Sequence, residues 1–292
     1  MKAVLHYTVS PGLRAMLTAG TPDWLDLATV EEGDKAGFTV ALQDAAVLLH
    51  VLEPVTADMI SAAPQLKLIQ KIGVGVNTID LDAARNHGVA VANMPGTNSQ
   101  AVAEMTLALM LASLRRIPLL DRLTRAGQGW ALPDGIMDYG GEISGRTVGL
   151  VGYGAVPQRL APVLVALGAR VVYANRSEKP DAVGEYRSLP ELLAESDIVS
   201  LHLPLTDETA GMIGIAAIAR MKPGAVLVNT ARGGLVDERA LIAALRGRRL
   251  AAAGLDTFAI EPAGADNPLF ALDNVVVAPH IGYLTPETLS RS

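Results

Sequence analysis

The chain has no cysteine among its 292 residues, and this absence excludes several kinds of site at once. Disulfides, thiolate metal ligands, iron–sulfur clusters and a cysteine nucleophile all need the missing side chain. The five histidines are widely spaced, with no HxH or HxxxH pair that would indicate a metal site. We therefore expect no metal.

Long hydrophobic runs are also missing, although 50% of the residues are apolar and the mean hydropathy is +0.31. The longest strongly apolar stretch, 105–114, is shorter than the ~20 residues of a membrane-spanning helix and is followed by Arg115 and Arg116. The N-terminus lacks the apolar core of a secretory signal. We expect no membrane partner and a cytoplasmic location.

The chain has no strong excess of positive or negative charge and no long run of basic residues. Lys and Arg total 24 against 30 Asp and Glu, and the basic residues are scattered apart from Arg246, Arg248 and Arg249. Nucleic acid is therefore not an expected partner. The apolar content excludes disorder, and a length of 292 residues favours two domains at ~150 residues each.

Short apolar runs alternate with turns and helical stretches, a pattern typical of α/β proteins with parallel sheets. A first series has predicted strands at 4–7, 46–51, 66–69 and 89–92, with helices at 57–62 and 81–86. A second series has predicted strands at 147–151, 170–174, 198–202, 225–229, 251–255 and 275–278. We predict an α/β fold of two Rossmann-like or flavodoxin-like domains, each with a doubly wound parallel sheet, and a cleft between them.

The segment between the two series contains a Pro95-Gly96 turn, which we interpret as a linker, and then a predicted long helix over 100–117. Residues 121–145 are irregular, with Trp130 and Tyr139 among glycines. We expect them to form a loop or arm that lies on another surface.

The most specific local motif is Gly152-x-Gly154, which directly follows a predicted strand and opens a helical stretch. In that context Gly152 permits a tight turn, Gly154 allows close approach of a pyrophosphate, and the helix N-terminus attracts its charge. The alternative is a glycine-rich turn without a ligand. Pro157 replaces the third glycine, and Pro162 predicts that the helix is kinked or shortened.

The second strand of this series ends in Asn175-Arg176-Ser177, where NAD-binding folds usually place an acid on the ribose 2′-hydroxyl. A neutral Asn175 does not repel a 2′-phosphate, Arg176 can pair with it, and Ser177 can donate a hydrogen bond. We predict that NADP(H) is preferred and that NAD(H) is possible. The alternative is that Arg176 is only a solvated side chain.

Three polar residues follow the later strands: Arg232, Glu261 and His280. Because the carboxyl ends of parallel strands share one edge, these residues can converge beside a cofactor. Each also has a simpler interpretation by itself. Arg232 could be a surface cation, Glu261 a helix cap, and His280 a histidine whose hydrogen bonds are satisfied within its own linker. We interpret His202 as structural.

The ordered motifs together resemble the D-isomer-specific 2-hydroxyacid dehydrogenase family over nearly the whole chain. The matching blocks are Gly73-Val-Gly75-Val-Asn77, Asn93-x-Pro-Gly-x-Asn98, Gly152-x-Gly154, His202-x-Pro204, Asn229-Thr-Ala-Arg232, Asp256-x-Phe-x-x-Glu261-Pro262 and Pro279-His280. The resemblance implies an oxidoreductase that transfers hydride between a nicotinamide cofactor and C2 of a small 2-oxo acid. It also implies a homodimer, formed through the helix near 100–117 and the arm after it.

The resemblance also implies roles for individual residues. His280 would be the general acid in reduction, Glu261 would orient its ring, and Arg232 would bind the substrate carboxylate. The backbone around Val74, Gly75 and Val76 would hold that carboxylate from the other side. The residues expected at the cofactor are Val102, Gly152, Gly154, Ala155, Val156, Asn175, Arg176, Ser177, Leu203, Pro204, Thr230 and Asp256.

Glyoxylate or hydroxypyruvate is the expected type of substrate. Phosphoglycerate is disfavoured because, beyond Arg232 and Lys71, no further basic set appears near the predicted site, and formate is disfavoured by Glu261, where formate dehydrogenases carry glutamine. A dinucleotide-sensing regulator, similar to a corepressor, is the alternative of another class. The predicted domains are 1–98 with 281–292 for substrate and 99–280 for the dinucleotide. Thr285 and Pro286 start a predicted helix, which is short; either the natural C-terminus is missing or the first domain is completed differently.

Overall fold

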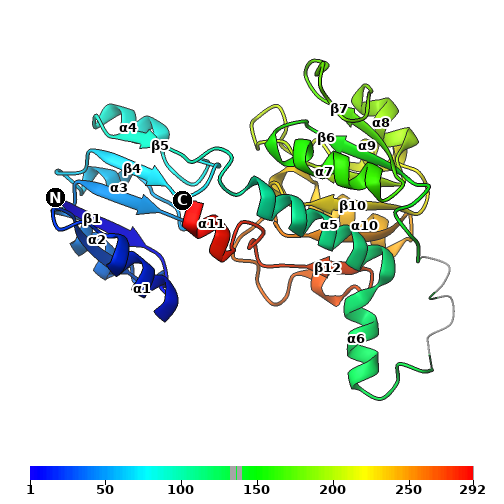
Figure 1. Ribbon diagram of the computed structural model, residues 1–292, viewed down its shortest axis with the longest axis horizontal. Coiled ribbons are helices and arrows are strands. Elements are labelled where there is room, and N and C mark those ends of the chain that lie inside the picture. The colour runs from blue at the N-terminus through cyan, green and yellow to red at the C-terminus, as the bar shows by residue number, and fades with distance from the viewer. Residues whose placement is uncertain (132–135, 137–139, 292) are drawn as a thin grey trace. The chain divides into compact units, whose positions relative to one another are not determined.

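The structure is a computed structural model that describes residues 1–131, 136 and 140–291, and it divides into two compact units (Figure 1). Unit 1 comprises Met1–Thr97 and the end of the chain from Ser290, and unit 2 comprises Asn98–Leu289. The boundaries expected from the sequence were 98 and 281, so residues 281–289 lie in unit 2 instead. Each unit is an α/β domain with a parallel sheet, as predicted.

Unit 1 has a five-stranded sheet in the order β2-β1-β3-β4-β5, and all neighbours are parallel. The strands are β1 (Lys2–His6), β2 (Asp26–Val30), β3 (Val47–His50), β4 (Leu68–Lys71) and β5 (Ala90–Ala92). This order is flavodoxin-like. The chain first adds β2 on one side of β1 and then adds β3, β4 and β5 on the other side, so the topological switch point lies between β1 and β3.

The helices of unit 1 are short and begin at side-chain caps. They are α1 (Pro11–Gly20), α2 (Lys35–Leu42), α3 (Ala57–Ser61) and α4 (Leu81–Asn86). The Asp80 carboxylate accepts the N–H of Ala83 at 2.8 Å, which satisfies one of the open donors in the first turn of α4. Phe38 of α2 and Ile60 of α3 pack with strand residues in one core.

Unit 2 has a seven-stranded parallel sheet in the order β12-β11-β10-β9-β6-β7-β8. The strands are β6 (Thr147–Val151), β7 (Arg170–Ala174), β8 (Glu185–Tyr186), β9 (Ile198–Leu201), β10 (Ala225–Asn229), β11 (Leu250–Leu255) and β12 (Val275–Val277). The chain moves outward from β6 in both directions, so the topological switch point lies between β6 and β9.

Helices cover both faces of this sheet: α5 (Ser99–Arg115), α7 (Ala155–Ala166), α8 (Leu189–Glu195), α9 (Ile215–Arg220) and α10 (Glu238–Arg246). Helix α6 (Ile117–Arg125) has no buried residue, and α11 (Pro286–Arg291) lies where the chain passes from unit 2 into unit 1. There are 3₁₀ turns at Gly233–Leu235 and Pro268–Ala271. Figure 1 shows α5 and α7 on one side of the strands. Residues of α8, α9 and α10 form a second core on the other face. This two-sided burial explains why the central strands are almost wholly apolar.

Several elements differ from those expected. The prediction missed β2 because it is a partly exposed edge strand, whose apolar pattern is weak, and it missed the two-residue β8. The long helix ends earlier than predicted, at Arg115, because Arg116 adopts a left-handed φ of 53°. Helix α6 then occupies part of the segment expected to be irregular. Trp130 is 97% exposed, whereas Tyr139 lies outside the described residues.

The helix after the glycine motif was predicted to be kinked or shortened, and the prediction of shortening was wrong. Helix α7 runs without interruption through Leu160–Leu164, with Pro162 inside it. Pro162 lies on the exposed side, where its ring does not disturb the buried packing of Leu160 and Leu164. That packing offsets the cost of a proline within a helix, about 3 kcal/mol. The predicted helix start at Thr285 is confirmed, since Thr285 Oγ1 accepts the N–H of Thr288.

Unit 1 contains a row of basic side chains that the sequence did not single out. His6, His50 and Lys71 are the last residues of β1, β3 and β4, and they are neighbours in register. All three are buried. Lys71 Nζ donates to the carbonyl of Val51, and His6 Nε2 lies 3.3 Å from a carboxylate oxygen of Glu53.

Burial, with the charge of Lys71 as a second cause, lowers the pKa of His50 to about 4. The unfolded chain binds a proton at this residue below pH ~6.5, whereas the folded chain does not until about pH 4. His50 therefore leaves stability unchanged above that range and lowers it as the pH falls through it.

We expect wild-type unit 1 to lose about 2 kcal/mol of unfolding free energy through His50 between pH 7.5 and 5, and His50→Gln to lose correspondingly less. Urea denaturation at the two pH values measures this difference. His87→Gln, at the exposed C-cap of α4, is the control. Equal losses in wild type and His50→Gln would contradict the assignment.

Candidate active site

The predicted site residues of unit 2 gather at the carboxyl edge of its sheet. Gly152 follows β6, Asn175 follows β7, Asp256 follows β11, and Arg232 and His280 lie in the loops after β10 and β12. All of these strands are parallel, so their ends emerge at the same edge. That edge is where open α/β sheets bind ligands.

The turn after β6 fits a dinucleotide. Gly152 has a φ of +93°, and a Cβ there would lie 2.6 Å from the carbonyl oxygen of His202, so only glycine is accommodated. Gly154 begins α7 without a side-chain cap, and a Cβ built on it meets nothing within 4 Å. The space beside Gly154 is therefore open, and the first N–H groups of α7, at Ala155 and Val156, have no side-chain cap, as an N-terminus that binds a pyrophosphate requires. Pro157 is buried in the same turn.

The loop after β7 holds the residues predicted to distinguish the two cofactors. Asn175 Nδ2 donates to the carbonyl of Ser177 at 3.0 Å, which closes a tight local turn. Arg176 between them is exposed, and no carboxylate among the described residues forms an ion pair with it. A cation is therefore available for a phosphate at this point.

His280 and Glu261 form a hydrogen-bonded pair. His280 Nδ1 lies 2.7 Å from Glu261 Oε2, and Glu261 Oε1 accepts the N–H of Phe258 at 2.8 Å. Burial acts to raise the pKa of Glu261, but the bonds from His280 and Phe258 and the charges of His280 and Arg232 outweigh it, so the pKa lies below its usual value. Glu261 is therefore ionised at neutral pH and can orient the ring of His280.

Arg232 is held by its own loop. Asn229 binds the backbone of two consecutive residues of this loop, since its Nδ2 donates to the carbonyl of Arg232 at 2.8 Å and its Oδ1 accepts the N–H of Ala231 at 3.0 Å. Burial lowers the pKa of Arg232, and the carboxylate of Glu261 opposes that change. A guanidinium nevertheless remains charged at neutral pH. Thr230 Oγ1 is 2.8 Å from Thr106 Oγ1, which ties the loop to α5.

Asp256 supports the segment that carries His280. Its two oxygens accept the N–H groups of Ile281 at 3.0 Å and Gly282 at 2.8 Å. Burial raises the pKa of Asp256, although these two bonds lower it. His280 itself has a left-handed φ of +55°, which is unfavourable for a non-glycine residue. We conclude that Asp256 holds the backbone on the far side of this unfavourable residue.

The remaining predicted residues are distributed over both units. Leu203 and Pro204 follow β9, and Leu203 packs beside Gly152. Val102 lies in the first turn of α5. Val74, Gly75 and Val76 belong to unit 1, in the loop after β4, where Asn93 Nδ2 donates to the carbonyl of Val74 at 2.7 Å. His202 Nε2 bonds to Ser200 Oγ at 2.9 Å, in agreement with a structural role.

Two supporting residues were missed as contributors to the site. Asn229 was noted only as part of a motif, and Gly233 was given no role. A Cβ on Gly233 would overlap the backbone carbonyl of Phe258, so the loop after β10 passes directly against the segment that leads to Glu261. An Asn that ends a buried strand and a Gly that follows an Arg were the signals available in the sequence.

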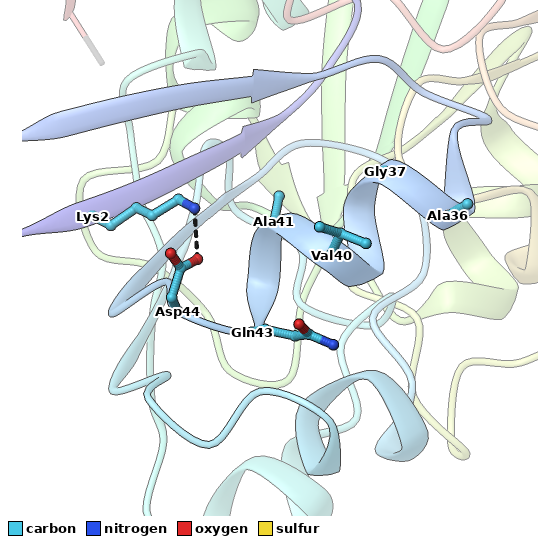
Figure 2. A pocket seen from close by; sticks show the side chains of 7 residues that line it. All are labelled: Lys2, Ala36, Gly37, Val40, Ala41, Gln43 and Asp44. Atoms are coloured by element: carbon cyan, nitrogen blue, oxygen red, sulfur yellow. Dashed lines mark hydrogen bonds and ion pairs between the residues drawn. The ribbon is translucent and has the colours of Figure 1, made fainter.

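A hollow in unit 1 has no catalytic side chains of this kind. A hollow of about 740 Å³ in unit 1 lies beside α2, and Figure 2 shows its lining, with Val40, Ala41 and the ion pair of Lys2 with Asp44 at 2.5 Å. No acid–base pair comparable to His280 and Glu261 lines it. Among the described residues, no group of His, Asp and Glu is placed to hold a metal ion, and no helix is long and apolar enough to cross a membrane.

The family model described as D-isomer specific 2-hydroxyacid dehydrogenase, NAD binding domain, matches residues 107–282. The chain belongs to this family. It is therefore an oxidoreductase with a nicotinamide dinucleotide cofactor, and the open Gly154 turn at α7 fits that group. The resemblance of the sequence motifs is confirmed.

Similar proteins carry two different names within the family. The chain is 44% identical to glyoxylate reductase of Aeropyrum pernix over 81% of its own length and 73% of that protein. It is 41% identical to D-3-phosphoglycerate dehydrogenase of Mycobacterium bovis over 97% of its length, but spans only 54% of that longer protein. The crystal structure of TT0316 protein from Thermus thermophilus superposes with a TM-score of 0.89 at 38% identity, over 100% of this chain and 93% of that one.

Adjacent glycines provide a test of the geometry of this dehydrogenase. We expect Gly233→Ala to lower the unfolding free energy by about 3 kcal/mol, because the new methyl group meets the Phe258 backbone. Gly234→Ala is the matched control, since its methyl group meets only the flexible side chain of Leu205 and should cost less than about 1 kcal/mol. Denaturant unfolding followed by circular dichroism compares them, and equal costs would contradict the close approach.

Proposed function

We propose that the protein reduces a small 2-oxo acid, of the glyoxylate or hydroxypyruvate type, to the D-2-hydroxy acid. The observation that carries this proposal is the 2.7 Å hydrogen bond between His280 and an ionised Glu261, in the same unit as the loop of Arg232. The similarity to a glyoxylate reductase over 81% of the chain supports the substrate class.

The side chains divide the work of this reaction. His280 Nε2 is available to protonate the carbonyl oxygen of the substrate, because Nδ1 is used by Glu261. Glu261 stabilises the imidazolium, and Arg232 binds the substrate carboxylate and polarises the carbonyl. The nicotinamide supplies the hydride when it is bound. Binding of the carboxylate by the backbone of Val74, Gly75 and Val76 stays a prediction, as do nicotinamide contacts of Asp256 and Val102.

We expect His280→Ala to lower kcat by at least about a hundredfold while the Kd of the cofactor stays within twofold, because the proton donor is lost but the cofactor turn is not. Glu261→Gln, which keeps the size of the side chain but removes its charge, should lose about tenfold. Steady-state kinetics and cofactor fluorescence measure the two quantities. His87→Ala in unit 1 is the control, and an unchanged kcat in His280→Ala would remove His280 from the mechanism.

We further propose that NADPH is preferred over NADH. The neutral Asn175 and the exposed Arg176 support this preference, because residues 175–177 offer a 2′-phosphate a cation and no carboxylate. Ser177 adds a hydroxyl donor at the next position.

Arg176→Ala should raise the KM for NADPH about tenfold and leave that for NADH nearly unchanged, since a charge-assisted bond is lost only with the phosphate. Arg220→Ala, at an exposed end of α9, is a control for the loss of a surface charge. If the wild-type enzyme showed equal kcat/KM with both cofactors, the preference would be rejected.

Oxidation of 3-phosphoglycerate is a second candidate reaction, favoured by the 41% identity that extends over 97% of the chain. Assays of glyoxylate, hydroxypyruvate, pyruvate, phenylpyruvate and 3-phosphoglycerate with both cofactors separate the candidates. Absence of turnover with every substrate, together with tight NADPH binding, would instead favour a dinucleotide-sensing regulator.

A homodimer is proposed as the assembly. Helix α6 has no buried residue, and Leu111 and Ile117 near the α5–α6 junction are 40% and 53% exposed. These exposed apolar side chains support the proposal of an interface at this junction. The cytoplasmic location stays a prediction.

A further inference from the structure

The loop between β7 and β8, residues 175–184, carries the residues proposed to bind a 2′-phosphate but has little packing of its own. Residues 176–181 are all exposed. A hollow of about 310 Å³ lies between residues 179–183 of this loop, Tyr153 and Gln158. Ala182 packs partly buried against the core, but the segment 176–181 has no such burial, so another interaction must determine its conformation.

Three tyrosines lie beneath this loop with neighbouring rings tilted against one another, by 46° and 59°, and we call this group the tyrosine stack: Tyr153, Tyr173 and Tyr186. The ring centroids of Tyr153 and Tyr173 are 4.5 Å apart, and those of Tyr173 and Tyr186 are 5.6 Å apart. Tyr153 and Tyr173 are 4% and 1% exposed. The rings come from the glycine turn, β7 and β8, so they form a rigid base built from separate elements.

Each hydroxyl of the tyrosine stack binds the backbone of the loop. Tyr173 Oη accepts the N–H of Lys179 at 2.9 Å and donates to its carbonyl at 3.2 Å. Tyr153 Oη accepts the N–H of Val183 at 2.8 Å and donates to its carbonyl at 3.1 Å. Tyr186 Oη donates to the carbonyl of Asn175 at 3.2 Å.

These bonds hold the loop at its beginning, its middle and its end. Because Tyr153 and Tyr173 each bind both the N–H and the carbonyl of one residue, they determine the orientation of the peptide groups as well as their position. Burial raises the pKa of Tyr153, so its hydroxyl keeps the proton that it donates. Arg176 and Ser177 lie between the points held by Tyr186 and Tyr173.

We propose that the tyrosine stack positions the 175–184 loop to bind the 2′-phosphate of the cofactor and thereby sets its selectivity for NADPH. This inference rests on the proposed NADPH preference. The tyrosines are positioning residues, because they act through the backbone on either side of Arg176. Removal of the Tyr173 or Tyr186 hydroxyl therefore weakens binding of the phosphorylated ribose and leaves the glycine turn unchanged.

The double variant Tyr173→Phe/Tyr186→Phe tests the inference, because it keeps both rings and removes both hydroxyls. The Kd values of NADPH, NADH, 2′,5′-ADP and 5′-AMP are measured by titration, and kcat is measured with saturating NADPH. We expect Kd to rise about three- to tenfold for NADPH and 2′,5′-ADP, to change less than twofold for NADH and 5′-AMP, and kcat to stay constant. Tyr7→Phe in unit 1 is the matched control.

A second measurement reports on the loop directly. Hydrogen exchange at the amide of Lys179 should become faster in Tyr173→Phe, since this N–H loses its acceptor. If the double variant does not fold, Tyr173→Phe alone provides both the exchange rate and the selectivity ratio.

The outcomes separate the two proposals. Equal rises in Kd for NADPH and NADH would show a merely structural role and overturn the inference. A second outcome would overturn the inference alone: wild type prefers NADPH, Arg176→Ala loses that preference, and the tyrosine variants keep it. Equal affinities of wild type for both cofactors would overturn the NADPH preference and the inference together.

Discussion

The parallel orientation of the strands in unit 2 is the constraint on which the site depends. Seven strands run in one direction, so every β–α connection must return along a face of the sheet. The carboxyl ends then lie along one edge, and the residues that follow β6, β7, β10, β11 and β12 meet there. Residues that are 128 positions apart in the chain, such as Gly152 and His280, therefore belong to one edge.

Side-chain hydrogen bonds to the backbone keep the loops of this edge in place. Asn229 holds the loop of Arg232, Glu261 binds the N–H of Phe258 as well as His280, and Asp256 binds Ile281 and Gly282. These bonds matter because the loops lack a regular ladder, and at His280 the backbone adopts a left-handed conformation. The polar residues proposed to act in the reaction thus also hold the backbone of the site in place.

The glycine turn after β6 and the 175–184 loop are held in place by different interactions. Gly152 is fixed by close packing against His202, whose carbonyl leaves no room for a side chain. The exposed 175–184 loop is instead held by hydroxyl groups from below. Close packing tolerates no substitution at Gly152, whereas a hydrogen-bonded loop can change residues such as Arg176 without loss of the fold. This difference suits a nicotinamide dinucleotide, because NAD and NADP share the pyrophosphate and differ only at the ribose 2′ position.

The sequence by itself determined the α/β class, most central strands and the family, because buried parallel strands are continuous apolar runs and the motifs are local. It also selected His280 and Glu261, although their hydrogen bond could not be deduced from their spacing. The sequence did not predict β2, because an exposed edge strand has a weak apolar pattern. It did not predict the helix end at Arg116, which a left-handed residue causes, or the continuity of α7 at Pro162, where tertiary packing outweighs local propensity. Only the tertiary structure revealed the row of His6, His50 and Lys71 and the tyrosine stack, because the pairing of strands brings together residues that no local pattern connects.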